Sequence, residues 1–268
     1  MCVLKVPLAS CIRYTEAQAL HGKALHLLSG HLEPGSYLRD LRSDHHLGLA
    51  ALQRRQADFC SAHQSLERAL ADCAVDDLQT CCVRLEAALL KRDLGDKPGA
   101  IEDCTAVLGA LGRHAGKSKI ALELQAMLEL AWMYFCDHDC HNAQVWFMAA
   151  IALVEGSPMA ADDLQYAQIF GGAAAVLFPE DCSQQASEYQ ARAEDHFKLL
   201  PCKMVEGAHM VLLYMATAKL RQGSKTPADK LFCDSLKSHS AVYSQGHPSI
   251  AILQRIVEKK LSFASTAK

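Results

Sequence analysis

Aromatic residues are scarce in this 268-residue sequence, at 6% of the chain, and the basic residues form no long run. The formal net charge is −3, so a nucleic-acid-binding surface is not expected. No apolar stretch reaches the roughly 18–20 residues that span a bilayer. Residues 1–12 are too short and too weakly charged for a convincing secretory signal. The apolar and polar alternation of a half-buried strand is also missing over any useful length.

Twelve cysteines are present, but they are scattered through leucine- and alanine-rich stretches. Secreted disulfide scaffolds concentrate their cysteines in a much shorter chain. Free cysteine behaves as a small buried hydrophobe, so we expect a reducing compartment, the cytoplasm or the nucleus. Alanine and leucine are strong helix formers, and their abundance predicts closely packed helices.

A small residue, followed seven and eight positions later by a small or apolar pair, recurs along the chain. The first residues of these units are Ala62, Ala100, Ala143, Ala186 and Ala228. Their separations are 38, 43, 43 and 42 residues. Such a near-constant period is the signature of a repeat architecture.

Each unit divides into two helical patterns around a short break. In the third unit the first apolar stripe lies at Leu124, Met127, Leu128, Ala131 and Tyr134, which is the spacing of an amphipathic helix. A polar break follows at 137–142, and a second stripe begins at Ala143. In the second unit the break contains Gly95 and Pro98, which suit a helix end and a helix start. The units are therefore predicted to be helix-turn-helix hairpins, and the fold all-α.

The third unit resembles the tetratricopeptide repeat (TPR). It carries the family's small, aromatic and turn residues at Ala131, Tyr134, Asp139, Ala143, Phe147 and Ala150. The spacing of 42 or 43 residues exceeds the family's common period of about 34. Gly246-His247-Pro248, followed by Ile250-Ala251, is similar to the connection between repeats of the kinesin light chain type. The resemblance implies a TPR-like α-solenoid with a C-terminal capping helix.

The predicted organisation has four parts. Residues 1–40 form an N-terminal segment with one degraded helix, and 41–247 form five TPR-like hairpins. Residues 248–261 form the capping helix, and 262–268 a tail. Terminal units of a solenoid need a polar outer face. The N-terminal edge here is not obviously polar, which leaves open that the chain is one segment of a longer array or part of a larger complex.

The resemblance also implies that the first helix of each hairpin lines a concave groove. The predicted groove residues are Glu86, Leu89, Arg92, Glu129, Trp132, Phe135, Tyr214, Thr217 and Arg221. Trp132, Phe135 and Tyr214 would anchor a partner, because aromatic residues dominate binding hot spots; Trp132 has the equal alternative of packing between repeats. The basic clamp of heat-shock co-chaperones is missing, since Leu85 and Leu128 are among the residues at its positions.

These features predict a non-enzymatic adaptor or scaffold, without a cofactor, that binds a peptide or an amphipathic helix of a protein partner. No Ser-His-Asp set, paired-carboxylate motif or nucleotide-binding signature stands out. Gly171-Gly172 lies in a helical pattern without the strand that a phosphate-binding loop requires. We therefore interpret this pair as a site where two helices approach closely.

The alternative function is a thiol- or zinc-dependent regulator that uses residues 136–141, which read C-D-H-D-C-H. Its metal ligands would be Cys136, His138, Cys140 and His141. A structural zinc site needs four converging ligands, commonly in two separated pairs, whereas these four are almost contiguous. We favour an ordinary turn between two helices, with Asp139 capping the second helix.

Overall fold

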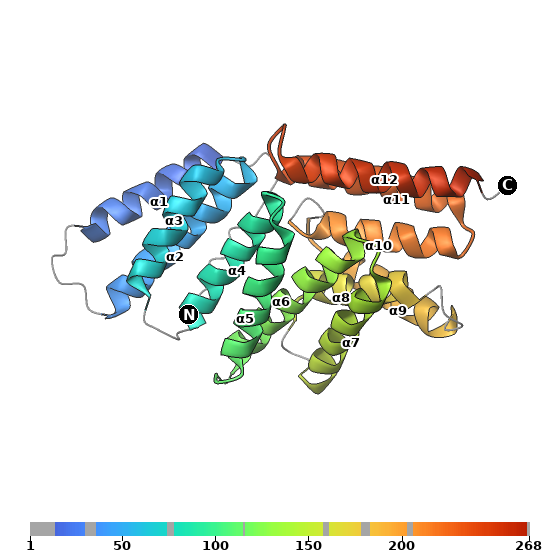
Figure 1. The fold of residues 1–268 in the computed structure, drawn as a ribbon, viewed down its shortest axis with the longest axis horizontal. Coiled ribbons are helices and arrows are strands. Elements are labelled where there is room, and N and C mark those ends of the chain that lie inside the picture. The colour runs from blue at the N-terminus through green and yellow to red at the C-terminus, as the bar shows by residue number, and fades with distance from the viewer. Residues whose placement is uncertain are drawn as a thin grey trace.

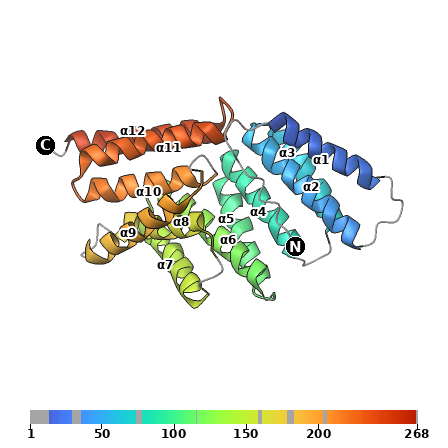
Figure 2. The same cartoon turned by 180° about the vertical axis from the view of Figure 1, so that it is seen from behind.

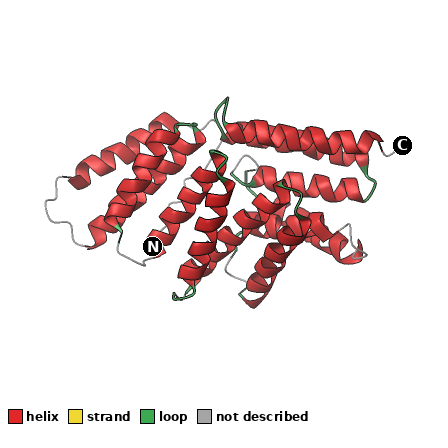
Figure 3. Cartoon of the chain, in the orientation of Figure 1, coloured by secondary structure: helices red, strands yellow, loops and turns green. Residues whose placement is uncertain are grey.

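The computed structural model describes residues 14–29, 36–73, 78–114, 116–157, 161–177, 183–202 and 206–266. Within these ranges all regular structure is helical (Figure 3). The helices are α1 (Tyr14–Ser29), α2 (Ser36–Arg55), α3 (Phe59–Asp72), α4 (Leu78–Asp93), α5 (Lys97–Leu111), α6 (Lys117–Cys136), α7 (Cys140–Gly156), α8 (Asp163–Leu177), α9 (Ser183–Leu199), α10 (Ala208–Arg221), α11 (Lys225–Val242) and α12 (Pro248–Thr266). None of the described helices is both long and apolar enough to cross a membrane.

Consecutive helices pack as pairs, α2 with α3, α4 with α5, α6 with α7, α8 with α9 and α10 with α11. Successive pairs stack side by side (Figure 1), and the first helix of each pair also contacts the first helix of the next. Helix α1 packs on α2 at one end of the array, and α12 packs on α11 at the other. The fold is an all-α, TPR-like helical repeat.

The ends of the chain differ in detail from the predicted boundaries. Helix α12 continues to Thr266, five residues beyond its predicted end. The predicted N-terminal segment contains α1 and the first residues of α2. Residues 1–13 of that segment and 267–268 of the predicted tail lie outside the described residues.

The turn inside each of the second and third pairs has the same construction. His138, in the turn that follows the first helix of its pair, has the left-handed conformation, with φ of 63°. Asp139 then caps α7, because its carboxylate accepts a hydrogen bond from the Asn142 backbone N–H at 3.1 Å. Gly95-Asp96 occupies the same place in the previous pair, with φ of 86° at the glycine. The predicted cap by Asp139 is confirmed, and residues 137–139 form the turn.

The alanines that reveal the period in the sequence are fully buried. One lies in the second helix of each pair: Ala62, Ala100, Ala143, Ala186 and Ala228. Protein interiors are packed as densely as organic crystals, so a side chain buried to this degree has little room to grow. A small residue at these positions lets neighbouring helices approach closely.

Ala143→Leu should lower the free energy of unfolding by about 1–3 kcal/mol, because the added atoms overpack the core around α7. Urea denaturation monitored by circular dichroism measures this loss. Ala191→Leu is the matched control, since Ala191 is an exposed residue of helix α9, and its stability should stay close to that of the parent. If Ala143→Leu unfolds with the parent, Ala143 does not mark a close helix contact.

Candidate functional site: the concave face

The apolar members of the predicted groove are buried within the protein. Trp132 is 8% exposed and Tyr214 is 1% exposed. Leu89, Phe135 and Thr217 are buried as well. For Trp132 this burial supports the alternative in which its ring packs between repeats.

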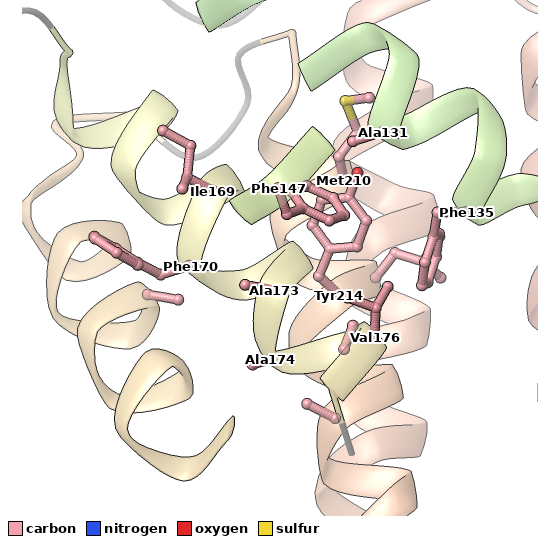
Figure 4. Packing of buried hydrophobic residues seen from close by; sticks show 14 of the residues in the cluster. Ala131, Phe135, Phe147, Ile169, Phe170, Ala173, Ala174, Val176, Met210 and Tyr214 are labelled. Carbon is pink, nitrogen blue, oxygen red and sulfur yellow. The ribbon is translucent and has the colours of Figure 1, made fainter. Parts of the chain in front are cut away.

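An aromatic cluster joins helices that are two pairs apart. Tyr214 of α10 lies edge-on to Trp132 and Phe135 of α6, with ring centroids 5.8 and 5.0 Å apart. It also meets Phe147 of α7 at 5.4 Å (Figure 4). Edge-to-face pairs at these separations add stability beyond the buried area. Burial raises the pKa of Tyr214 well above its ordinary value. These rings belong to one buried core cluster in which α6 and α10 meet.

The charged members of the predicted groove are partly exposed. The side chains of Glu86 and Glu129 are 13% and 14% exposed. Arg92 forms ion pairs with Glu129 and, at 2.9 Å, with Asp93. Arg221 donates a hydrogen bond to the carbonyl of Ala175 in α8.

The sequence suggests that Arg54-Arg55 is the solvated end of a helix, but the structure buries Arg54. Arg54, at the end of α2, is 1% exposed. Its Nε donates to Glu86 at 2.6 Å, its Nη1 to Asp93 at 2.7 Å and its Nη2 to Glu206 at 2.8 Å. Each nitrogen of the guanidinium thus has its own carboxylate partner, two from α4 and one from the connection before α10.

Glu206, in the connection before α10, contacts residues near both ends of the array. Its carboxylate accepts a hydrogen bond from Arg55 Nε at 2.9 Å and one from the Tyr243 hydroxyl at 2.7 Å. Burial alone would raise the pKa of Glu206, but Arg55 and Arg54 outweigh it and hold that pKa well below its ordinary value. Glu206 is therefore an ionised carboxylate at neutral pH.

The remaining carboxylates of this network differ in their proton affinity. Burial raises the pKa of Glu86 and of Glu129, and the arginine beside each only partly offsets it. Burial also tends to raise the pKa of Asp93, but Arg92 and Arg54 together hold that pKa below its ordinary value. Ionisation is thus stabilised most where two guanidinium groups face one carboxylate.

A column of rings extends from the charged network toward α12. The centroids of His209 and His239 are 4.1 Å apart, those of His239 and Tyr243 4.4 Å, and those of Tyr243 and His247 4.5 Å. Burial lowers the pKa of each of these histidines, for His239 to about 4. The Gly246-His247-Pro248 motif marks one end of this column in the sequence, but it gives no sign of the other rings.

The two ends of the array meet through a set of contacts that we call the terminal clasp, between residues 54–55 and 243–247. The Ser244 backbone N–H donates to the Arg55 carbonyl at 3.0 Å, and His247 Nε2 lies 3.0 Å from the Arg54 carbonyl. Figures 1 and 2 show the start of α12 beside the end of α2 from opposite sides. The clasp therefore joins the end of α2 to the start of α12.

The alternative metal site at Cys136, His138, Cys140 and His141 gains no support from the geometry. Among the described residues, no three or more histidine, cysteine or acidic side chains are grouped so that they could hold a metal ion. Burial raises the pKa of Cys136 to about 12, so its thiol stays protonated at neutral pH. A thiolate is the form that binds metals and attacks disulfides. Of the other proposed ligands, Cys140 has its Sγ atom 3.6 Å from Nη2 of Arg221, which is a hydrogen-bond donor.

Comparisons with known proteins identify a fold. No family model matches the sequence, and no curated protein matches it. The structure is similar to the crystal structure of BtubC (BKLC) from P. vanneervenii, a kinesin light chain-like TPR protein, with a TM-score of 0.62 and 12% sequence identity. The similarity covers 85% of this chain and 92% of that one. At this identity the likeness shows the fold alone, and that fold is a TPR-like α-solenoid.

Proposed function

We propose that the chain is a non-enzymatic scaffold that binds a peptide or an amphipathic helix of another protein on its concave face. The observation that carries this proposal is the fold, a continuous stack of helix pairs along nearly the whole described chain. Such arrays provide extended curved surfaces on which proteins bind one another. The similarity to a kinesin light chain-like TPR protein supports the same class of function.

The partner would first contact the charged members of the predicted groove. Glu86, Arg92 and Glu129 reach solvent in this closed form, whereas Trp132, Phe135 and Tyr214 do not. The aromatic residues would become available only when the array opens. Leu89, Thr217 and Arg221 complete the proposed groove.

The double variant Glu86→Gln/Glu129→Gln tests the concave face with little change in volume. The amide oxygens can still accept hydrogen bonds from Arg54 and Arg92. Burial already raises the pKa of both glutamates, so loss of their charge should cost little stability. Partners are first captured from cells with the parent protein, purified, and titrated into each variant by calorimetry. A partner bound at this face should lose at least about tenfold in affinity.

Glu67→Gln/Glu102→Gln is the matched control. It removes the same charge from exposed positions on the second helices α3 and α5, and it should leave affinity unchanged. Binding elsewhere on the protein is indicated if the concave variant keeps every partner at parental affinity. Equal losses in both double variants would indicate a response to overall charge instead.

A further inference from the structure

Hydrogen bonds at the terminal clasp determine where His247 carries its hydrogen. The Arg54 carbonyl, 3.0 Å from His247 Nε2, can only accept, so Nε2 carries the hydrogen and donates it. The Nδ1 atom lies 3.2 Å from the Ser249 backbone nitrogen, which can only donate. Nδ1 therefore has no hydrogen and acts as an acceptor. The Ser249 hydroxyl, 2.5 Å from Nδ1, donates its hydrogen to it as well.

The same reasoning extends to His239. Once Ser249 has donated its hydrogen to His247, its oxygen accepts one from His239 Nε2, which lies 2.8 Å away. His239 Nδ1 is then a bare acceptor, and it is buried without a hydrogen-bond partner. The result is a one-way chain of donors, from His239 through Ser249 and His247 to the Arg54 carbonyl at the end of α2.

The surroundings of His247 disfavour a second hydrogen on its ring. Its side chain is fully buried, and Phe59 of α3 and Tyr243 lie against the ring at 5.5 and 4.5 Å. Burial, with Arg54 and Arg92, outweighs the attraction of Asp93, whose carboxylate lies 3.7 Å from Nε2, and lowers the pKa of His247. The ring is neutral in the closed array at neutral pH.

We propose that His247 is a pH switch. Its protonation at Nδ1 releases the terminal clasp, so that the two ends of the array separate. A proton taken from solvent would turn Nδ1 from an acceptor of two hydrogen bonds into a donor. It would then face the Ser249 N–H, which can only donate, so that bond would be lost, and the Ser249 hydroxyl would have to turn and accept instead. A charged ring is also destabilised in this buried site, and when the ring leaves, its contact with the Arg54 carbonyl is lost with it.

The direction of the pH effect follows from the two states. In the opened array the pKa of His247 lies near the ordinary imidazole value of about 6.5, whereas in the closed array that pKa is lowered. Acid therefore favours opening, and the ratio of open to closed protein rises by up to about tenfold for each pH unit below 6.5. Glu86 and Glu129 act in the opposite direction, because their pKa values are raised in the closed form. His209 and His239 act in the same direction as His247.

Hydrogen-exchange mass spectrometry of the full chain at pH 7.5 and pH 5.5, corrected for intrinsic exchange rates, tests this pH switch. In the parent, protection within 50–57 and 243–249 should fall about tenfold at the lower pH, while α6 and α8 stay protected. His247→Gln and His247→Asn do not titrate but keep an amide donor and acceptor. Both should lose the roughly tenfold share of this acid response that His247 contributes. His63→Gln replaces an exposed histidine of α3 and should keep it.

Two results would overturn the proposal. One is a parent whose clasp peptides are equally protected at both pH values. The other is an acid response that is as large in both His247 variants as in the parent. Any effect of opening on partner binding rests on the proposed function, but exchange is measured without a partner. If partners bind at another surface, the exchange result is unchanged. If His247 does not control the clasp, the calorimetric result is unchanged.

Discussion

Arg54→Met is expected to lower the free energy of unfolding by about 3–5 kcal/mol, the cost of removing one partner from a buried ion-pair network. Methionine keeps much of the packing of the arginine side chain, but it leaves Glu86, Asp93 and Glu206 without their shared guanidinium. Asp93 suffers most, because its side chain is only 1% exposed. One further consequence is expected, a weaker contact between the ends of the array.

Urea denaturation followed by the fluorescence of the two tryptophans measures this loss. Arg39→Met is the control, since Arg39 is an exposed residue of the same helix, and its effect should stay within about 0.5 kcal/mol. Adding Asp93→Asn to Arg54→Met should recover part of the loss, because it removes a buried charge that then has Arg92 as its remaining guanidinium partner. A loss below about 1 kcal/mol for Arg54→Met would mean that water replaces the guanidinium without cost, contrary to a buried network.

Two adjacent glycines of α8 should respond to alanine in opposite directions. A Cβ atom at Gly172 would lie well inside the van der Waals radius of the Phe147 ring, which is fully buried. Gly172→Ala should therefore destabilise by about 3 kcal/mol, near the top of the usual range for overpacking. At Gly171 a Cβ atom would meet Tyr214 Cβ at 3.5 Å and Ala193 Cβ at 3.6 Å, which is ordinary contact. Gly171→Ala should be neutral or stabilise by up to about 1 kcal/mol, the helix propensity gained.

Thermal and urea unfolding of the two variants side by side tests this difference. Each serves as the other's control, because the substitution, the helix and the depth of burial are the same. The close helix approach inferred from the sequence is supported specifically at Gly172. Equal stabilities would mean that Phe147 moves aside at no cost, and that α7 and α8 are not in tight contact at this point.

The terminal clasp changes what is expected of a repeat array. Solenoids behave nearly as one-dimensional stacks, in which each repeat contacts only its neighbours. Here Arg54 and Arg55 pair with Glu206, which is 152 and 151 residues away in the chain. Contacts of this range couple the first pair of helices to the last, so the array should unfold as one cooperative unit.

The groove prediction illustrates what a repeat pattern leaves undecided. The spacing that puts Trp132, Phe135 and Tyr214 on first helices says which face of each hairpin they occupy. It does not say whether that face meets solvent or another part of the chain. Their burial depends on α10 approaching α6 across the concave side, which is set by rotation accumulated over several pairs.

The helical hairpins, their period of 42 or 43 residues and the turn at Asp139 can all be predicted from the amino-acid sequence. These features are local, because helix periodicity, a capping aspartate and an alanine between two helices each involve residues close in the chain. The contacts of Arg54, Glu206 and His247, by which the array closes on itself, become visible only in the folded chain. Small rotations between successive pairs add up along the stack, and no short stretch of sequence records their sum.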